Sequence, residues 1–279
     1  MKVISFVNMK GGVGKSTLAV NFASCLAQRN SQKTLIIDMD PQFNATQCLI
    51  NTKQYVEHKK SNKDTILNVF HTNPLLDVSI ISGATPATVK PLNEVEPTFI
   101  EENLYLLPGD LSLHRIEMVA GNGSELRLKR FLDGIKDQNF DYVIIDTPPT
   151  PSIWMASSLI ASDYYIIPLK PDPISVTGID LLESIIEGKK ANYDLKIKCL
   201  GVILNMVEEG TIVYRNTFDY LQSVPKWNKH LLASSIPKRV KIAQHQTNGR
   251  HILELGDDAL SMRLAQMTDE IVLKIQENS

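Results

Sequence analysis

Hydrophobic and polar positions alternate along this chain in blocks. Short runs of apolar, often β-branched residues are separated by longer stretches in which apolar residues recur at helical spacing. Short apolar runs are typical of strands covered on both faces, as in a parallel sheet with crossover helices. The expected strands are 3–7, 34–37, 104–107, 142–145, 164–168 and 200–205. The pattern predicts an α/β fold, a three-layer, mostly parallel twisted sheet flanked by helices, in a single domain over residues 1–279.

Helices are expected in the polar stretches between these strands. The expected helices are 16–28, 111–136, 176–192, 214–222 and 257–276. Asp110 or Ser112 is the candidate cap of the second helix, and Asp257 or Asp258 that of the last. Residues 51–98 are the least regular part, with a lysine-rich patch and four prolines, so loops and short helices are expected there.

Composition places the chain among globular proteins. It is 43% hydrophobic and 22% charged, which is ordinary for a protein with a packed core. No run of about 18 apolar residues predicts a membrane helix, and the N-terminus lacks a signal-peptide cleavage pattern, so we expect a cytoplasmic protein. Cys25, Cys48 and Cys199 have no CxxC spacing and are expected to be reduced thiols.

Charge is distributed unevenly over the sequence. The net charge is −2, but residues 196–251 hold nine basic and three acidic side chains, which leaves −8 for the remainder of the chain. A basic segment on an otherwise acidic protein is a candidate surface for binding a polyanion. A solvated basic surface with no ligand has the same composition and stays open as an alternative.

The first expected strand leads into a glycine-rich loop that is followed by a helix. The loop residues are Lys10, Gly11, Gly12, Val13, Gly14, Lys15, Ser16 and Thr17. Phosphate oxygens need several backbone N–H donors at once, which glycine permits, and the helix N-terminus adds its positive end. Lys15 supplies a charge for the β- and γ-phosphates, and the Ser16 hydroxyl is placed to ligate Mg²⁺. The loop predicts an ATP site with a magnesium ion.

This loop departs from the common pattern G-x-x-x-x-G-K-[ST]. Met9 stands where the first glycine would be, and a second lysine, Lys10, begins the loop. In this respect the sequence resembles the deviant Walker A P-loop ATPases, the ParA/MinD family, whose loop reads K-G-G-x-G-K-[ST]. The resemblance implies that Lys10 reaches the phosphates of a partner subunit in an ATP-dependent homodimer that encloses two nucleotides.

Two further strands end in carboxylates. Asp38 and Asp40 follow the strand at 34–37, and Asp146 follows the strand at 142–145. Ligands gather at the carboxyl ends of parallel strands, so these acids are expected beside the phosphate loop, with Pro41 ending the first strand. The resemblance implies that Asp40 positions the attacking water, while Asp38 and Asp146 serve Mg²⁺ through its water shell. Acids that only cap the next helix are the alternative.

The order of motifs resembles ParA/Soj partition ATPases most closely. The matching stretches are 38–46, which reads Asp-Met-Asp-Pro-Gln-Phe-Asn-Ala-Thr, then 146–149, 201–206 and 235–240. The resemblance implies that Asn205 hydrogen-bonds adenine, that Met206 lies beside it, and that Ile236 and Pro237 pack on the base. A turn-forming asparagine is the alternative interpretation of Asn205.

For the basic segment, the resemblance implies nonspecific binding of double-stranded DNA in the ATP state. Phosphate contacts of that kind carry no sequence information and weaken with salt. The candidate residues are Arg215, Lys226, Lys229, Lys238, Arg239, Lys241 and Arg250. The implied activity is Mg²⁺-dependent ATP hydrolysis that drives plasmid or chromosome partition or cargo positioning, stimulated by a ParB-like or other adaptor. The implied location is the cytoplasm, on the nucleoid in the ATP state.

Rival functions in the same family need features that this sequence lacks. A MinD-like ATPase at a membrane surface would need a basic amphipathic C-terminal helix, whereas residues 268–279 are amphipathic but acidic. A reductase of the nitrogenase iron-protein type would need cluster-binding cysteines. Only seven residues precede Asn8, so no helix-turn-helix domain is expected before the loop. The MinD-like function remains the alternative, and no membrane contact is expected.

Overall fold

The protein is built around one central β-sheet. The computed structural model describes residues 1–71, 89–118, 123–172, 175–246, 249 and 251–278. Its strands are β1 Lys2–Phe6, β2 Thr34–Asp38, β3 Thr98–Glu101, β4 Leu104–Leu107, β5 Tyr142–Asp146, β6 Tyr164–Leu169, β7 Lys198–Val207 and β8 Leu231–Pro237. They form an eight-stranded sheet in the order β3-β4-β2-β5-β1-β6-β7-β8, parallel except for the pair β3–β4. The expected α/β sheet is confirmed.

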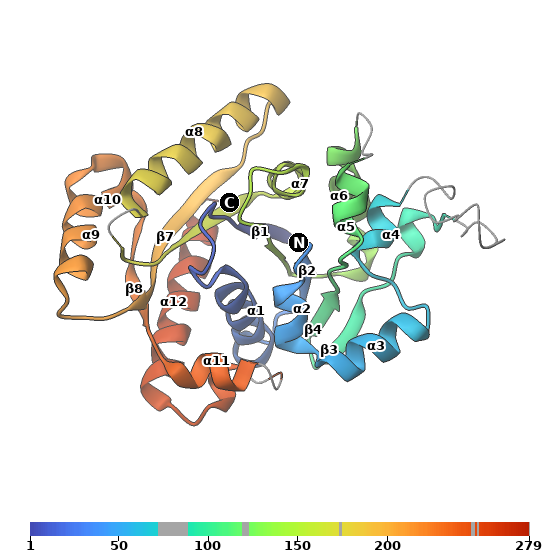
Figure 1. Cartoon of the computed structure of the whole chain (residues 1–279), viewed down its shortest axis with the longest axis horizontal. Coiled ribbons are helices and arrows are strands. Elements are labelled where there is room, and N and C mark those ends of the chain that lie inside the picture. The colour runs from blue at the N-terminus through green and yellow to red at the C-terminus, as the bar shows by residue number, and fades with distance from the viewer. Residues whose placement is uncertain (72–88, 119–122, 173–174, 247–248, 250, 279) are drawn as a thin grey trace.

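Helices cover both faces of this sheet (Figure 1). They are α1 Lys15–Asn30, α2 Asn44–Leu49, α3 Thr52–Lys60, α4 Ile66–Phe70, α5 Leu113–Glu117, α6 Arg127–Gly134, α7 Ile153–Ala161, α8 Ser175–Tyr193, α9 Ile212–Ser223, α10 Pro225–His230, α11 Val240–Gln246 and α12 Asp258–Glu277. Short 3₁₀ turns lie at Leu92–Glu94, Ser124–Leu126, Lys136–Gln138 and Ile252–Glu254. Helices α1 and α12 lie on one face, and α6, α7 and α8 on the other.

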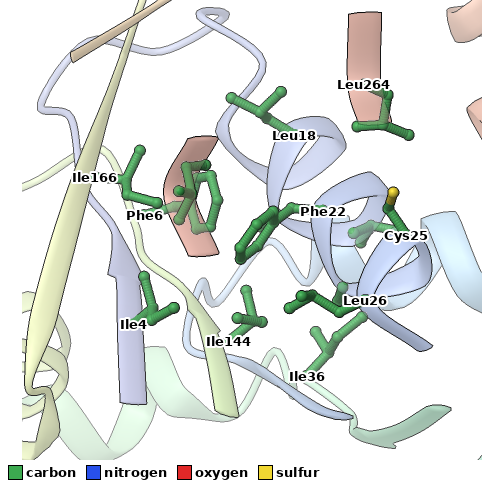
Figure 2. Close-up of a cluster of buried hydrophobic side chains, with 14 of the residues drawn as sticks. Ile4, Phe6, Leu18, Phe22, Cys25, Leu26, Ile36, Ile144, Ile166 and Leu264 are labelled. Atoms are coloured by element: carbon green, nitrogen blue, oxygen red, sulfur yellow. The ribbon is translucent and has the colours of Figure 1, made fainter. Parts of the chain in front are cut away.

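Side chains that point alternately to the two faces of the sheet form a hydrophobic core on each face. Even-numbered residues of β1 and its neighbours point toward α1, as Figure 2 shows for Ile4, Phe6, Ile36, Ile144 and Ile166. They meet Leu18, Phe22 and Leu26 of α1, and Leu264 of α12 joins the same cluster. Odd-numbered residues of the same strands pack on the opposite face. Because both faces are buried, each central strand is apolar throughout, and this is why these strands could be predicted.

Several elements differ from the expectations. The single helix expected at 111–136 is wrong, because α5 and α6 are separate helices and Gly123 between them has a φ of 89°. Strands β3 and β8 and the buried helix α7 were not predicted. Asp257 caps α12, its side chain accepting from the backbone N–H of Leu260. In the described parts of the region expected to be irregular, 51–71 and 89–98, loops and short helices occur as expected, together with the start of β3, whereas 72–88 lie outside the described residues.

The outer edge of β8 is covered by a side chain of α12. Both carboxylate oxygens of Glu270 accept backbone N–H groups of this strand, from Ala233 at 2.9 Å and from Ser234 at 3.1 Å. Backbone donors on an edge strand usually face solvent, so a carboxylate that accepts two of them satisfies this edge within the chain.

Candidate functional site

The glycine loop joins the end of β1 to the start of α1. Gly12 and Gly14 have φ values of 71° and 78°, a left-handed conformation that glycine adopts without strain. Gly14 is the N-cap of α1 and offers no side-chain acceptor, and the first turn of α1 holds no acidic residue. The free backbone donors and the positive end of a 16-residue helix therefore point toward this loop, an arrangement suited to phosphate.

Lys15 lies between the loop and the acids. Its side chain is buried, and its Nζ atom lies 3.5 Å from the carbonyl oxygen of Lys10. Burial lowers the pKa of the Lys15 ammonium group, and the nearby Asp146 and Asp40 oppose this change. A buried ammonium group facing carboxylates is held where an anionic ligand would neutralise it.

Lys10 is oriented differently in this chain. Its ammonium group forms an ion pair with Asp172, which follows β6, and its side chain is 39% exposed. Its backbone N–H donates to Oδ1 of Asn8, and the Asn8 amide in turn donates to the carbonyl of Pro168. The start of the loop is therefore tied to the end of β6. The contact of Lys10 with a partner's phosphates stays a prediction.

The acids of β2 and β5 meet as the sheet topology requires. Asp38 and Asp146 are direct neighbours in the parallel register of these two strands, and both are fully buried. Neither carboxylate oxygen of Asp146 has a hydrogen-bond partner among the described residues. Burial raises the pKa of Asp146 to about 7, although the Ser16 hydroxyl and the Lys15 ammonium group oppose the rise.

An unpaired buried carboxylate beside a serine hydroxyl fits a magnesium site. Mg²⁺ is bound in proteins by one or two carboxylates together with waters and substrate phosphates. Asp146 and Ser16 would hold the ion or its waters, because the open lone pairs of Asp146 are those that a cation would occupy. These roles stay predictions.

Asp38 differs from Asp146 because protein groups already engage it. Its Oδ2 atom accepts from the backbone N–H and from the hydroxyl of Thr46, each at 2.7 Å, and its Oδ1 atom accepts from the backbone N–H of Asp40. Burial and the neighbouring Asp146 nevertheless raise the pKa of Asp38 well above its usual range. Asp38 thus anchors the start of α2, and its role toward Mg²⁺ stays a prediction.

Asp40 lies at the start of the loop between β2 and α2. It is buried, and its Oδ1 atom accepts from the backbone N–H of Gln42 at 2.9 Å. Burial raises the pKa of Asp40, while that hydrogen bond and the charge of Lys15 oppose the rise. Asp40 therefore lies near Lys15, and its role toward an attacking water stays a prediction.

Two residues beside the acids were not predicted as part of the site. The Thr46 hydroxyl, which donates to Asp38, also accepts from the backbone N–H of Gly109 at 2.8 Å. A Cβ atom on Gly109 would lie 2.6 Å from Cβ of Phe43 and 3.0 Å from Cγ of Asp38, so only glycine fits there. Thr46 is part of a matching motif, but its link to Gly109 spans 63 positions and has no sequence signal.

The residues predicted for adenine lie close to the glycine loop. The Asn205 amide on β7 donates to the carbonyl of Val13 at 2.8 Å, and a Cβ atom on Gly14 would lie 2.5 Å from Asn205 Nδ2. Met206, with a φ of 54°, also lies against Gly14. On the neighbouring strand β8, Ile236 is paired with Asn205, and both Ile236 and Pro237 are buried. Their contact with a base stays a prediction.

The predicted DNA-binding residues do not form one group. Lys226 and Lys229 lie on α10, before β8, whereas Lys238, Arg239 and Lys241 follow its carboxyl end. The seven residues of β8 span about 23 Å, because a strand rises about 3.3 Å per residue. Arg215 is exposed on α9, and Arg250 lies outside the described residues.

Acidic partners reduce the charge of several of these residues. Lys226 pairs with Glu183, Lys238 with Glu208 at 2.6 Å, and Arg239 with Asp257 at 3.7 Å. No helix within the described residues is long and apolar enough to cross a membrane.

Comparisons with known proteins agree with this arrangement. A family model described as an AAA domain matches residues 1–198. The chain is 32% identical over 257 residues to the sporulation initiation inhibitor protein Soj of Bacillus subtilis, covering 90% of each chain. It is 33% identical over 284 residues to a ParA family protein of Chlamydia pneumoniae, covering 99% of this chain and 100% of the relative.

Solved structures share the fold over nearly the whole chain. A plasmid partition protein of Borrelia burgdorferi B31 bound to AMPPNP has a TM-score of 0.72 at 23% identity, covering 100% of this chain and 99% of that one. Apo McdA of Cyanothece has a TM-score of 0.76 at 21% identity, covering 97% and 99%. The matching relatives, together with the glycine loop and the strand-end acids, show that the chain belongs to the ParA/Soj type of P-loop partition ATPases.

Proposed function

We propose that this protein hydrolyses ATP with Mg²⁺, closes into a homodimer around two nucleotides, and binds DNA nonspecifically in that state to position a cargo. The observation that carries the proposal is the buried Lys15, which faces both the glycine loop and the strand-end acids. Backbone donors, an ammonium group and an unpaired carboxylate at one place are the groups that a metal-bound triphosphate requires.

Each residue has a distinct part in the proposed reaction. The N–H groups of the loop and Lys15 hold the β- and γ-phosphates. Asp146 and Ser16 would hold Mg²⁺ or its waters, where a divalent cation would supply positive charge beside the phosphate oxygens. Asp40 orients the water that attacks the γ-phosphorus, and the bond from that phosphorus to the bridging oxygen breaks to give ADP and phosphate.

Exposed apolar residues favour an interface at this end of the sheet. Leu111 follows β4, Ile212 follows β7 and Val240 follows β8, and Ile212 and Val240 are 73% and 70% exposed. Large apolar side chains that gather on one end of a molecule are typical of protein interfaces. Dimer closure would also require Lys10 to exchange Asp172 for a phosphate of the partner subunit's nucleotide.

DNA would be bound through Lys238, Arg239 and Lys241, which follow β8 on the nucleotide side of the sheet. Relatives whose names report chromosome partition support a positioning function. An adaptor protein that stimulates hydrolysis would release the dimer from DNA. No observation favours the MinD-like alternative.

A DNA retardation assay tests this function most directly. The protein is mixed with plasmid-length DNA without nucleotide, with ADP, or with AMPPNP, at several salt concentrations. We expect retardation only with AMPPNP, weakening as salt rises, and no retardation for Lys15→Ala in any condition. Parallel light scattering should report a dimer only with AMPPNP. Retardation that is independent of nucleotide, or a monomer in every state, would refute the proposed switch.

A further inference from the structure

A cavity of about 480 Å³ lies at the opposite end of the sheet from the glycine loop. It opens at the start of β7 and is walled by α8, α10 and α12. Its lining is rich in lysine, with Lys190, Lys198, Lys226, Lys229 and Lys274. Lysines contributed by three helices and one strand therefore line one open cavity, which differs from a row of lysines on a flat surface.

Acidic residues neutralise only part of this charge. Glu187 pairs with Lys190 at 2.8 Å, and Glu183 pairs with Lys226. Glu277 is the third acid in the lining. Among the described residues, the ammonium groups of Lys229 and Lys274 have no partner in an ion pair or hydrogen bond, although the backbone carbonyl of Lys274 accepts from the Asn278 amide.

A neighbouring imidazole shows that the ammonium groups converge. His230, the last residue of α10, lies in the cavity lining. Burial lowers the pKa of His230, and the charges of Lys274, Lys229 and Lys226 lower it further. Three ammonium groups from two helices thus act on one side chain, which means that the cavity has a positive potential without a bound counterion.

We propose that this cavity binds an anion that carries two or more phosphate groups. Lysine is a point-charge donor that suits phosphate oxygens, and a cavity of several hundred Å³ is the size of a small-ligand site. The site is separate from the glycine loop, because β7 runs about 23 Å from Lys198 in the cavity to Asn205 at the loop. The assignment does not depend on the proposed function.

Calorimetric titration with inorganic tripolyphosphate tests the assignment. The titration is done on the wild-type chain and on Lys15→Ala, which disables the glycine loop, and we expect binding to persist in both. In the Lys15→Ala background, adding Lys229→Gln and Lys274→Gln should weaken binding at least about tenfold, because each lost charge-assisted contact is worth roughly a factor of ten. The control adds Lys53→Gln and Lys60→Gln, two exposed lysines of α3, and should leave the affinity unchanged.

Two results would overturn the assignment. One is binding that disappears in Lys15→Ala, since the glycine loop would then be the only site. The other is equal weakening by both pairs of lysine substitutions, since the effect would then be one of net charge. Circular dichroism of every variant, Lys15→Ala included, checks that the chain remains folded.

A tryptophan in the cavity wall locates the ligand. The chain has two tryptophans, and Trp227 lines the cavity, with Nε1 donating to Asp180 at 2.9 Å. In Trp154→Phe, tripolyphosphate should change the emission of Trp227, and an unchanged emission at saturation would place the anion elsewhere. Competition by a DNA duplex would identify nucleic-acid phosphates as the source, and lack of competition would identify a free phosphorylated molecule.

Discussion

Replacing Asp146 by asparagine should stabilise the ligand-free protein while abolishing hydrolysis. Burial raises the pKa of this carboxyl from 3.8 to about 7. A carboxyl with a higher pKa in the folded state binds its proton more tightly there, so stability falls as pH rises from about 4 to about 7. The interval corresponds to about 4 kcal/mol at pH 8, because each pKa unit is about 1.4 kcal/mol.

Asparagine has the same shape but cannot ionise, so most of this penalty disappears. The buried amide still lacks partners, which costs roughly 1–3 kcal/mol, and the expected net gain is about 1–3 kcal/mol at pH 8. This gain corresponds to a rise in Tm of roughly 2–8 °C for a chain of this size. At pH 4 the wild-type carboxyl is protonated in the folded state and the ionisation penalty is absent, so the gain should vanish and the amide should leave the variant less stable than wild type by up to roughly 1–3 kcal/mol.

Differential scanning calorimetry at pH 4, 6 and 8, without nucleotide or Mg²⁺, measures this effect. The matched control is Asp137→Asn, the same substitution at an exposed carboxylate, which should show no such pH dependence. Magnesium with a nucleotide should raise the Tm of the wild-type protein more than that of Asp146→Asn. A variant that is less stable than wild type at pH 8, or equally changed at pH 4 and pH 8, would refute the reasoning.

Three further substitutions test other parts of the site. Gly14→Ala should abolish ATP binding in calorimetry, because a Cβ atom would enter the space of the neighbouring β7 amide at a φ of 78°; retained affinity would contradict this. Thr46→Val should lower the free energy of unfolding by about 3–5 kcal/mol in urea, because two buried hydrogen bonds are lost, whereas Thr46→Ser should restore most of it. Changing Lys238, Arg239 and Lys241 to glutamine should reduce the log–log salt slope of DNA binding by roughly 0.9 per lost phosphate contact, and an unchanged slope would move DNA to another surface.

The strands could be predicted wherever burial on both faces makes the sequence uniformly apolar. Strand β8 escaped prediction because it is an edge strand with the polar centre Ser234 and Ser235, so its apolar content is low. Helix α7 was not predicted because its sequence is too uniformly apolar. Its residues are nearly all buried, so no polar face marks a helical period.

The site residues that could be predicted are those whose partners are close in sequence, and the ones that could not depend on long-range contacts. The loop at 10–17 could be predicted because its donors, its lysine and its helix are contiguous. The support of Asp38 could not be predicted, because Gly109 approaches it from the loop that follows β4. The basic residues are close in sequence, yet β8 spans about 23 Å between the lysines that precede it and the basic residues that follow it. Local charge in the sequence therefore did not predict that these residues lie on separate surfaces.

Glu270 restricts how copies of this chain can associate. Unpaired backbone donors at the margin of a sheet are the groups that recruit a strand from another molecule, and here two of them already have a charged acceptor. An incoming strand would have to displace this carboxylate and bring its own carbonyl oxygens against a negative charge. Pairing of another strand with this part of β8 is therefore disfavoured, and a sheet continued from one copy of this chain to another would have to form without these two donors.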